Sequence, residues 1–232
     1  MLPIRDDTPR STTPYVTYFL IALNLVIYFF EWMLEVSYGP RAKAAFELHY
    51  ALVPHHVSDW ISGYVPASLA LLPFVSSMFL HASWLHVGFN MWFLAIFGDN
   101  VEDRLGHFPF LLFYMVCGLG ANFTHYAFNF MSPLPAVGAS GAIAGVMGAY
   151  FLLFPRARVL TWWGLFVFWL PAWLVLGFWF LGEFLSGAAS IFTSSGGAGG
   201  VAFWAHVGGF ICGLVLIKVL PTRKNVYAFE DY

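Results

Sequence analysis

Six long apolar runs alternate with shorter polar stretches along the 232 residues of the chain. A run of about 20 apolar residues is long enough for a helix to cross the hydrocarbon core of a bilayer. We therefore predict an all-α membrane protein in which six transmembrane helices form one bundle. The predicted spans cover residues 15–36, 83–101, 108–130, 138–154, 159–183 and 201–220.

Two polar ends and one long connection complete this organisation. Residues 1–14 form a short segment without a signal-peptide cleavage site, residues 15–220 the membrane domain, and residues 221–232 a short tail. The connection, residues 37–82, is apolar but interrupted by prolines, which predicts a partly embedded first loop resting on the bundle. A Gly/Ser-rich stretch, residues 186–200, predicts a flexible loop between the last two spans.

The composition strengthens the membrane assignment and narrows the partners. Hydrophobic residues make up 60% of the chain and charged residues only 9%, whereas soluble domains carry about 25% charged residues. The lipid bilayer is therefore an expected partner, and a net charge of −2 gives no indication of nucleic-acid binding. The two cysteines, Cys117 and Cys212, lie in apolar runs, where we interpret them as small core residues.

Basic residues predict the orientation of the bundle. Most of the ten lysines and arginines fall in segments that a six-span topology places on one side. Because basic residues concentrate on the cytoplasmic side, we expect both termini there, in a protein of the bacterial cell membrane. Only Arg41 and Lys43 fall on the outer side. The inner residues are Arg5, Arg10, Arg104, Arg156, Arg158, Lys218, Arg223 and Lys224.

Polar residues recur at one depth in the predicted bundle. Spans two, four and six run from the outer to the inner side, and their outer ends carry His86 and Asn90, Ser140, and His206. Polar side chains inside a membrane are costly and by default indicate function. Ser140 lies in the sequence Gly138-Ala139-Ser140-Gly141, where it is either a nucleophile or one more small residue for helix packing.

A nucleophilic serine needs a base, and His206 is the only histidine of the sixth span. Glycines spaced by four occur on the fourth and sixth spans, at Gly141 and Gly145 and again at Gly209 and Gly213. Two such faces pack closely, which would bring the serine hydroxyl against the imidazole. The alternative is that His206 forms only structural hydrogen bonds.

His86 and Asn90 are four residues apart and therefore share one helix face. That face offers hydrogen-bond donors for an oxyanion, and the first helical turn at Ser140 adds free backbone N–H groups. The same two side chains are also suited to tying helices together. His81 is expected to stabilise the turn into the second span.

No acidic residue belongs to a motif with His206, so a Ser–His dyad is predicted rather than a triad. Glu183, at the end of the fifth span, is expected to contact the gate or extend to the membrane surface and to be dispensable for chemistry. Histidines on the outer side suggest zinc, but H-E-x-x-H is absent and no cysteine or acidic ligand has metal spacing. Neither a metal nor another cofactor is expected.

Motifs on three spans are specific only in combination. They are H-x-x-x-x-H-x-x-x-N from His81 to Asn90, G-x-S-G from Gly138 to Gly141, and A-H-x-x-G-x-x-x-G from Ala205 to Gly213. With these motifs the chain resembles the rhomboid intramembrane serine proteases over nearly its whole length. Glu102-Asp103-Arg104, after the second span, is similar to the E-x-R stretch of that family.

The resemblance implies a role for each matching residue. Ser140 would be the nucleophile and His206 the general base and acid. His86, Asn90 and the backbone N–H of Ser140 would line an oxyanion hole. Gly138 and Ala139 would shape the wall of this hole. Glu102 and Arg104 would pair on the cytoplasmic side.

The resemblance also implies the substrates, which would be transmembrane segments of other membrane proteins, cut near the outer face at a small residue. The fifth span and the Gly/Ser-rich loop would be gate and cap. Some family members have an aromatic residue four positions after the serine, where this chain has Ala144. Some also have a Trp-Arg pair in the first loop, which this sequence lacks.

Two other function classes compete with a protease. One is a catalytically silent binder of membrane helices in quality control, and the presence of both Ser140 and His206 argues against it. The other is a transporter, but the polar layer lies near one face rather than at the bilayer centre, and no inverted repeat is apparent.

Overall fold

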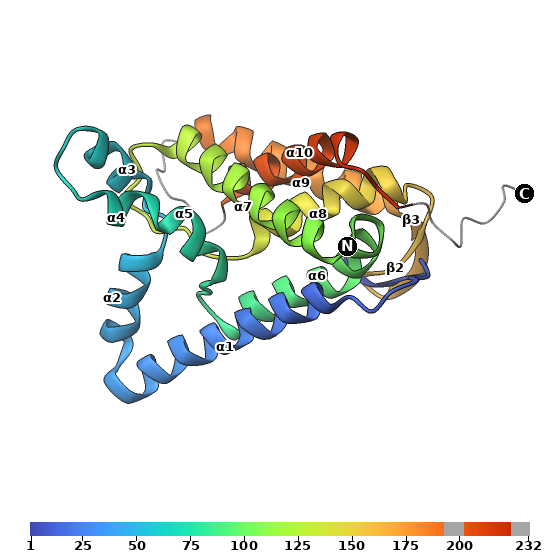
Figure 1. The fold of residues 1–232 in the computed structure, drawn as a ribbon, viewed down its shortest axis with the longest axis horizontal. Helices are drawn as coiled ribbons and strands as arrows, with labels where there is room; N and C mark the ends of the chain where they lie inside the picture. The colour runs from blue at the N-terminus through green and yellow to red at the C-terminus, as the bar shows by residue number, and fades with distance from the viewer. Residues whose placement is uncertain (193–201, 224–232) are drawn as a thin grey trace, which may run out of the picture.

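The computed structural model describes residues 1–192 and 202–223, and this part of the chain is mostly helical (Figure 1). Long apolar helices follow the predicted runs closely, except at the fifth. Their bounds are α1 Tyr15–Tyr38, α6 Trp84–Leu105, α7 His107–Asn129, α8 Ser140–Leu153, α9 Ala172–Phe192 and α10 Phe203–Val219.

Three of these helices, α1, α7 and α9, are long and apolar enough to cross a membrane within the described residues. A fourth span is possible if α6 is counted together with residues 67–79, from which it is bent by 73°. Helices α8 and α10 are apolar but shorter. The protein is therefore an integral membrane protein, with three or four spans by length and composition alone.

The start of the predicted fifth span is wrong. Residues 159–171 are not helical; they belong to strands β2, Arg158–Trp163, and β3, Phe166–Pro171, which form an antiparallel hairpin. The run is rich in β-branched and aromatic residues, which favour strands, and Gly164 turns the chain with a φ of +63°. Strand β1, Leu2–Asp6, completes a three-stranded sheet in the order β1-β2-β3.

The Gly/Ser-rich stretch is also partly helical, because α9 continues to Phe192. The rest of that predicted loop lies outside the described residues.

The segment between α1 and α6 consists of short helices at one end of the molecule (Figure 1). Prolines begin three of them, because proline fits the first helical turn without losing a hydrogen bond. An isolated bridge between Leu52 and Ala136 joins this segment to the α7–α8 connection. The bounds are α2 Pro40–Tyr50, α3 Pro54–Ile61, α4 Ala67–Leu71, α5 Pro73–Ser76 and a 3-10 turn, Ser77–Phe79.

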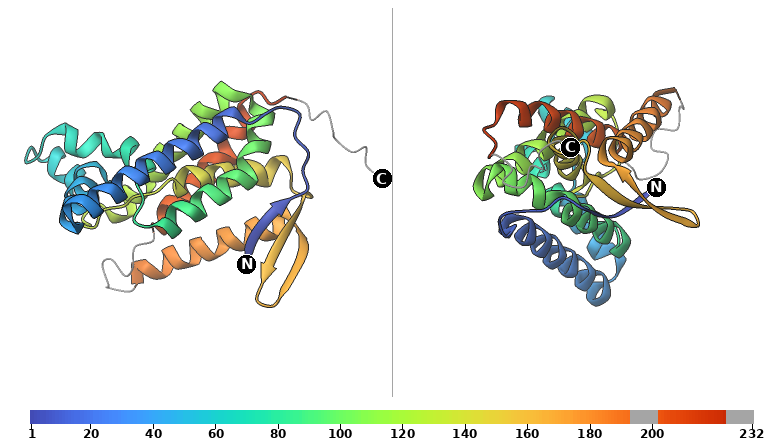
Figure 2. Two further views of the ribbon diagram at one scale, coloured as in Figure 1. Left: turned by 90° about the horizontal axis from the view of Figure 1, so that it is seen from below. Right: turned by 90° about the vertical axis from the view of Figure 1, so that its right-hand side faces the viewer.

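Helix α8 lies at the centre of the bundle, with residues 141–150 all buried. Helices α8 and α10 pack side by side (Figure 2), and their glycines meet backbone to backbone. A Cβ atom at Gly209 would lie 2.0 Å from the Gly141 carbonyl oxygen, and one at Gly213 would lie 1.9 Å from that of Gly145. Only glycine permits this approach, which fixes the position of α10 against the start of α8.

At the end of the bundle opposite the short helices, hydrogen bonds to a buried acid join the helices. Glu102 is fully buried and accepts hydrogen bonds of 2.7 Å from both the backbone N–H and the hydroxyl of Thr17. The Arg104 Nε donates instead to the Arg223 carbonyl at 2.7 Å. The expected Glu102–Arg104 pair is therefore replaced by these contacts, since residues two apart on a helix do not face each other.

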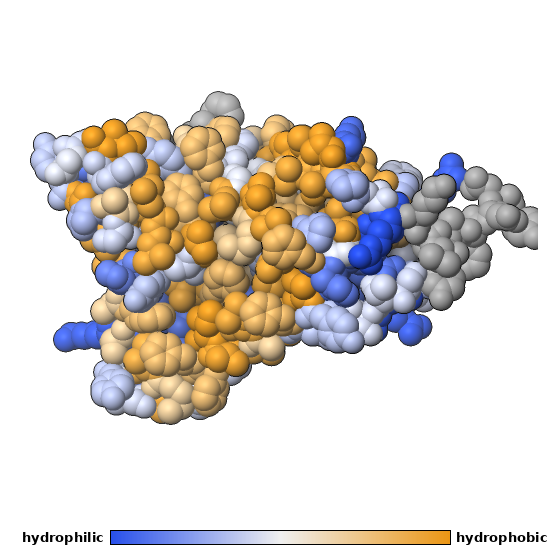
Figure 3. Space-filling view, viewed as in Figure 1, coloured by the Kyte–Doolittle hydropathy of each residue, from blue (hydrophilic) through white to orange (hydrophobic). Residues whose placement is uncertain are grey.

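Apolar side chains cover the middle of the face seen in Figure 3, whereas hydrophilic ones gather toward its two ends. The exposed apolar residues include many aromatic ones on α1, α6, α7 and α9. Such a belt between two polar ends is typical of a surface that lies in lipid.

Candidate active site

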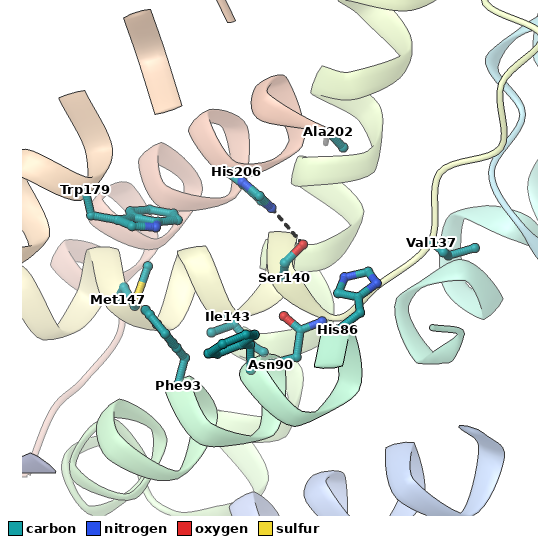
Figure 4. A pocket seen from close by; sticks show the side chains of 11 residues that line it. His86, Asn90, Phe93, Val137, Ser140, Ile143, Met147, Trp179, Ala202 and His206 are labelled. Carbon is teal, nitrogen blue, oxygen red and sulfur yellow. Dashed lines mark hydrogen bonds between the residues drawn. The ribbon is translucent and has the colours of Figure 1, made fainter. Parts of the chain in front are cut away.

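Ser140 and His206 lie in hydrogen-bond contact. Ser140 is the first residue of α8, and His206 lies in the first turn of α10. The glycine contacts between these helices bring His206 Nε2 to 2.8 Å from Ser140 Oγ (Figure 4). A neutral imidazole nitrogen at this distance can accept the hydroxyl proton, which is what a serine nucleophile requires.

A carboxylate completes this contact from the other side. Glu183 Oε2 lies 2.8 Å from His206 Nδ1, so the expectation that no acid is placed against His206 is wrong. Glu183 is the only acidic residue of α9. A single ionisable residue in an apolar helix indicates function by default, and this signal was available in the sequence.

Trp179 lies one turn before Glu183 on α9, and its ring centre is 5.8 Å from that of His206. Ala144, where some rhomboid proteases have an aromatic residue, is fully buried in the core. The aromatic contact to the histidine therefore comes from α9 instead of α8. Sequence reasoning did not identify Trp179, because nothing in its local sequence distinguishes it from the lipid-facing aromatic residues of α9.

His86 and Asn90 line the same site from the start of α6. The Ser83 hydroxyl caps this helix by accepting a 3.1 Å hydrogen bond from the His86 backbone N–H. Asn90 is only 7% exposed, and its Nδ2 has no hydrogen-bond partner among the described residues. A buried amide donor without a partner is costly, so it is available for an acceptor that enters the site.

The residues before Ser140 form a close-fitting wall. Gly138 has a φ of +129°, and its backbone N–H donates to the Ser77 carbonyl at 2.9 Å. Ala139 is fully buried beside it. Because Gly138 has no side chain, the backbone of this wall lies directly against the His86 imidazole and the Asn90 amide on α6.

His81 lies behind this wall. It is fully buried, its ring centre lies 5.1 Å from that of His86, and its backbone N–H donates to Glu31 Oε2 at 3.1 Å. This bond ties the turn before α6 to α1. Neither ring nitrogen has a hydrogen-bond partner among the described residues.

A cavity of about 340 Å³ opens directly onto Ser140 (Figure 4). One side carries the polar groups of Ser140, His206, His86 and Asn90. The other side is apolar and is lined by Phe89, Phe93, Ile143, Met147 and Trp179. A mostly apolar cavity with a few convergent polar groups is the usual form of a binding site.

The described residues contain no cluster of three or more histidine, cysteine, aspartate or glutamate side chains that would hold a metal. Cys117 is buried and neither it nor Cys212 forms a disulfide. The chemistry that this arrangement supports is acyl transfer through Ser140, because the contact with His206 Nε2 gives the serine a proton acceptor and donor.

Comparison with known proteins agrees with the motifs. Residues 69–223 match the Rhomboid domain family. Rhomboid protein 1, mitochondrial, of Saccharomyces cerevisiae is 29% identical over 66% of this chain and 42% of its own length. RHOMBOID-like protein 6, mitochondrial, of Arabidopsis thaliana is 31% identical over 63% and 42%. Rhomboid protease GluP of Bacillus subtilis is 30% identical over 60% and 25%.

The match thus covers less than half the length of each of these relatives. The family match, residues 69–223, includes the whole of the site, from His81 on the approach to α6 to His206 on α10. Because the family match covers most of the chain, the chain belongs to the rhomboid family.

Proposed function

We propose that this protein is a serine endopeptidase that cleaves transmembrane segments of other proteins within the membrane. The observation that carries the proposal is the 2.8 Å contact between Ser140 Oγ and His206 Nε2 at the wall of an apolar cavity. The relative from Bacillus subtilis is named a rhomboid protease, which supports this function over a purely structural one.

In the proposed reaction Ser140 Oγ attacks the carbonyl carbon of a peptide bond and passes its proton to His206 Nε2. The resulting imidazolium then protonates the leaving amine as the carbon–nitrogen bond breaks, which leaves an acyl group on the serine. A water molecule, deprotonated by the same imidazole, hydrolyses this ester and restores the hydroxyl.

The negative charge on the former carbonyl oxygen needs donors already in place. We assign this role to Asn90 Nδ2, to the His86 imidazole and to the backbone N–H of Ser140. Two features support the assignment: the Asn90 amide N–H has no partner in the described part of the chain, and Ser140 begins a helix, where N–H groups are free.

The apolar side of the cavity fits a hydrophobic segment, and its volume fits only a short, unwound piece of chain. We therefore propose that the substrate unwinds near Ser140 and is cut there at a small residue. Access is from lipid, between α6 and α9.

The proposal places all six apolar helices across the membrane, with α8 and α10 as short spans. Both termini are cytoplasmic, because the sheet end of the molecule carries most of the basic residues. The bacterial cell membrane remains the predicted location; among the relatives, the one from Bacillus subtilis is bacterial and those from yeast and Arabidopsis carry mitochondrial names.

A cleavage assay on a panel of single-span membrane proteins in liposomes tests the proposal. The parent protein should cut at least one of them and Ser140→Ala none. Labelling with a serine-directed fluorophosphonate should mark the parent and not the variant. A parent protein that neither cuts nor labels, yet binds the single-span proteins, would be a catalytically silent binder instead.

A further inference from the structure

We infer that Glu183 is a positioning residue for His206, so that the site works as a Glu–His–Ser triad and not as a dyad. This inference rests on the proposed protease function. It concerns a residue outside the motifs by which the chain resembles its family.

Glu183, His206 and Ser140 form a continuous line of contacts. Glu183 Oε2, His206 and Ser140 Oγ are joined by two contacts of 2.8 Å, one at each ring nitrogen. The Glu183 and His206 side chains are only 18% and 12% exposed, which protects their contact from competition by water.

The contact with Glu183 also selects the tautomer of His206. An ionised carboxylate only accepts hydrogen bonds, so a carboxylate at Nδ1 places the imidazole proton on that nitrogen. The lone pair of Nε2 then faces the serine hydroxyl, which is the tautomer required of a general base. When His206 takes up the serine proton, the nearby carboxylate also stabilises the resulting positive charge.

Few other groups hold the His206 ring in place. Among the described residues, the His206 ring makes hydrogen bonds only to Ser140 and Glu183, and α8 has a buried methyl group, not an aromatic ring, at Ala144. Orientation of the ring thus depends on α9, through the Trp179 ring on one side and Glu183 at Nδ1. A glutamate that only extended toward the membrane surface would not need a partner in the site.

The test compares Glu183→Gln and Glu183→Asp with the parent protein in liposomes. A glutamine offers the imidazole an N–H donor and so favours the wrong tautomer. We expect Glu183→Gln to lower kcat by at least about tenfold with little change in KM, and to slow fluorophosphonate labelling of Ser140 by the same factor. Glu183→Asp keeps the charge and should recover part of the rate.

Asp59→Asn is the matched control, because Asp59 also contacts a histidine. Its Oδ2 lies 3.3 Å from His55 Nε2, and both residues are on α3 and not at the cavity. Asp59→Asn should leave both rates unchanged. Thermal unfolding of each variant separates positioning from folding, since a merely structural Glu183 would lower Tm and activity together and aspartate would not restore the rate.

Normal kcat and normal labelling in Glu183→Gln, beside an inactive Ser140→Ala, would overturn the triad and leave the protease. Full cleavage by Ser140→Ala would overturn the protease itself. The two failures are thereby distinguished.

Discussion

Gly138 lies so close to His86 that a Cβ atom on the glycine would come within 2.8 Å of the imidazole Nε2. The same position is only 3.5 Å from Asn90 Nδ2. The backbone φ of +129° is one that residues with a side chain rarely adopt. Glycine is thus required at position 138 for two reasons: the conformation of the backbone and the lack of space beside α6.

Gly138→Ala should therefore damage the site more than the fold. We expect it to displace His86 and Asn90, to lower kcat strongly, and to reduce the free energy of unfolding by about 1–3 kcal/mol. Gly88→Ala is the matched control, because a Cβ atom there meets nothing within 4 Å and α6 should tolerate it. Steady-state kinetics and thermal unfolding measure both effects, and normal turnover by Gly138→Ala would contradict the assignment of this wall.

Ser140→Ala and His206→Ala should each remove cleavage almost completely. The two groups act as one unit, so each single loss is expected to exceed about a thousandfold in kcat, and the double variant should be no worse than either single variant. Ser62→Ala, on the exposed end of the first loop, should cleave normally. Substantial turnover by either site variant, at unchanged Tm, would rule out its assigned role.

Asn90→Ala tests the oxyanion hole. Loss of one preorganised donor typically costs about 3 kcal/mol in the transition state, or roughly a hundredfold or more in kcat. KM should hardly change, because the interaction strengthens only when negative charge develops on the carbonyl oxygen.

Asn24→Ala serves as the comparison for Asn90→Ala, since Asn24 is buried on α1 and bonds only to the Leu20 carbonyl. That variant should lose stability and keep its specific activity. If Asn90→Ala behaves in the same way, Asn90 is a structural tie between helices.

Gly213→Ala tests the contact between α8 and α10. The added methyl group would overlap the Gly145 carbonyl and force the helices apart, at a cost of about 1–3 kcal/mol in the free energy of unfolding. Activity should fall as well, because His206 would move away from Ser140. Gly182→Ala, where a Cβ atom meets nothing within 4 Å, should change neither Tm nor kcat.

The orientation is tested with single cysteines at Ser62 and Ser11, both exposed, in a background where Cys212 is replaced by alanine. An impermeant reagent should label Ser62→Cys from outside intact cells. Ser11→Cys should react only after the membrane is opened. The reverse pattern would place the active site on the cytoplasmic side.

The sequence predicts those parts of the fold that depend on local composition. Apolar runs place α1, α6, α7, α8 and α10 within a few residues, because a helix in lipid needs little beyond length and hydrophobicity. The same criterion fails at residues 159–171, where a strand hairpin and a helix have equally apolar sequences.

The site divides in a similar way. Ser140, His206, His86 and Asn90 are found from motif spacing, and the structure brings all four to one cavity. The lone charge of Glu183 in an apolar helix indicates a functional residue, but its contact with His206 depends on how α9 packs against α10, which no local pattern records. The Glu102–Arg104 pair was expected from motif likeness, although a two-residue spacing on a helix turns the side chains apart.

The small sheet blocks one end of the space between α6 and α9. Strand β1 runs beside α6 from Asn100, which donates to Asp6 at 3.0 Å, to Trp92, whose Nε1 donates to the Pro3 carbonyl at 2.9 Å. Strand β3 leads directly into α9, so the two helices are bridged by strands along this stretch. A second cavity of about 260 Å³, bordered by Pro3, Phe93 and Glu183, lies beside the first residues of β1. With the proposed function and orientation, a membrane-spanning substrate would have to bend in from the outer half of the bilayer, and its inner half would stay in lipid.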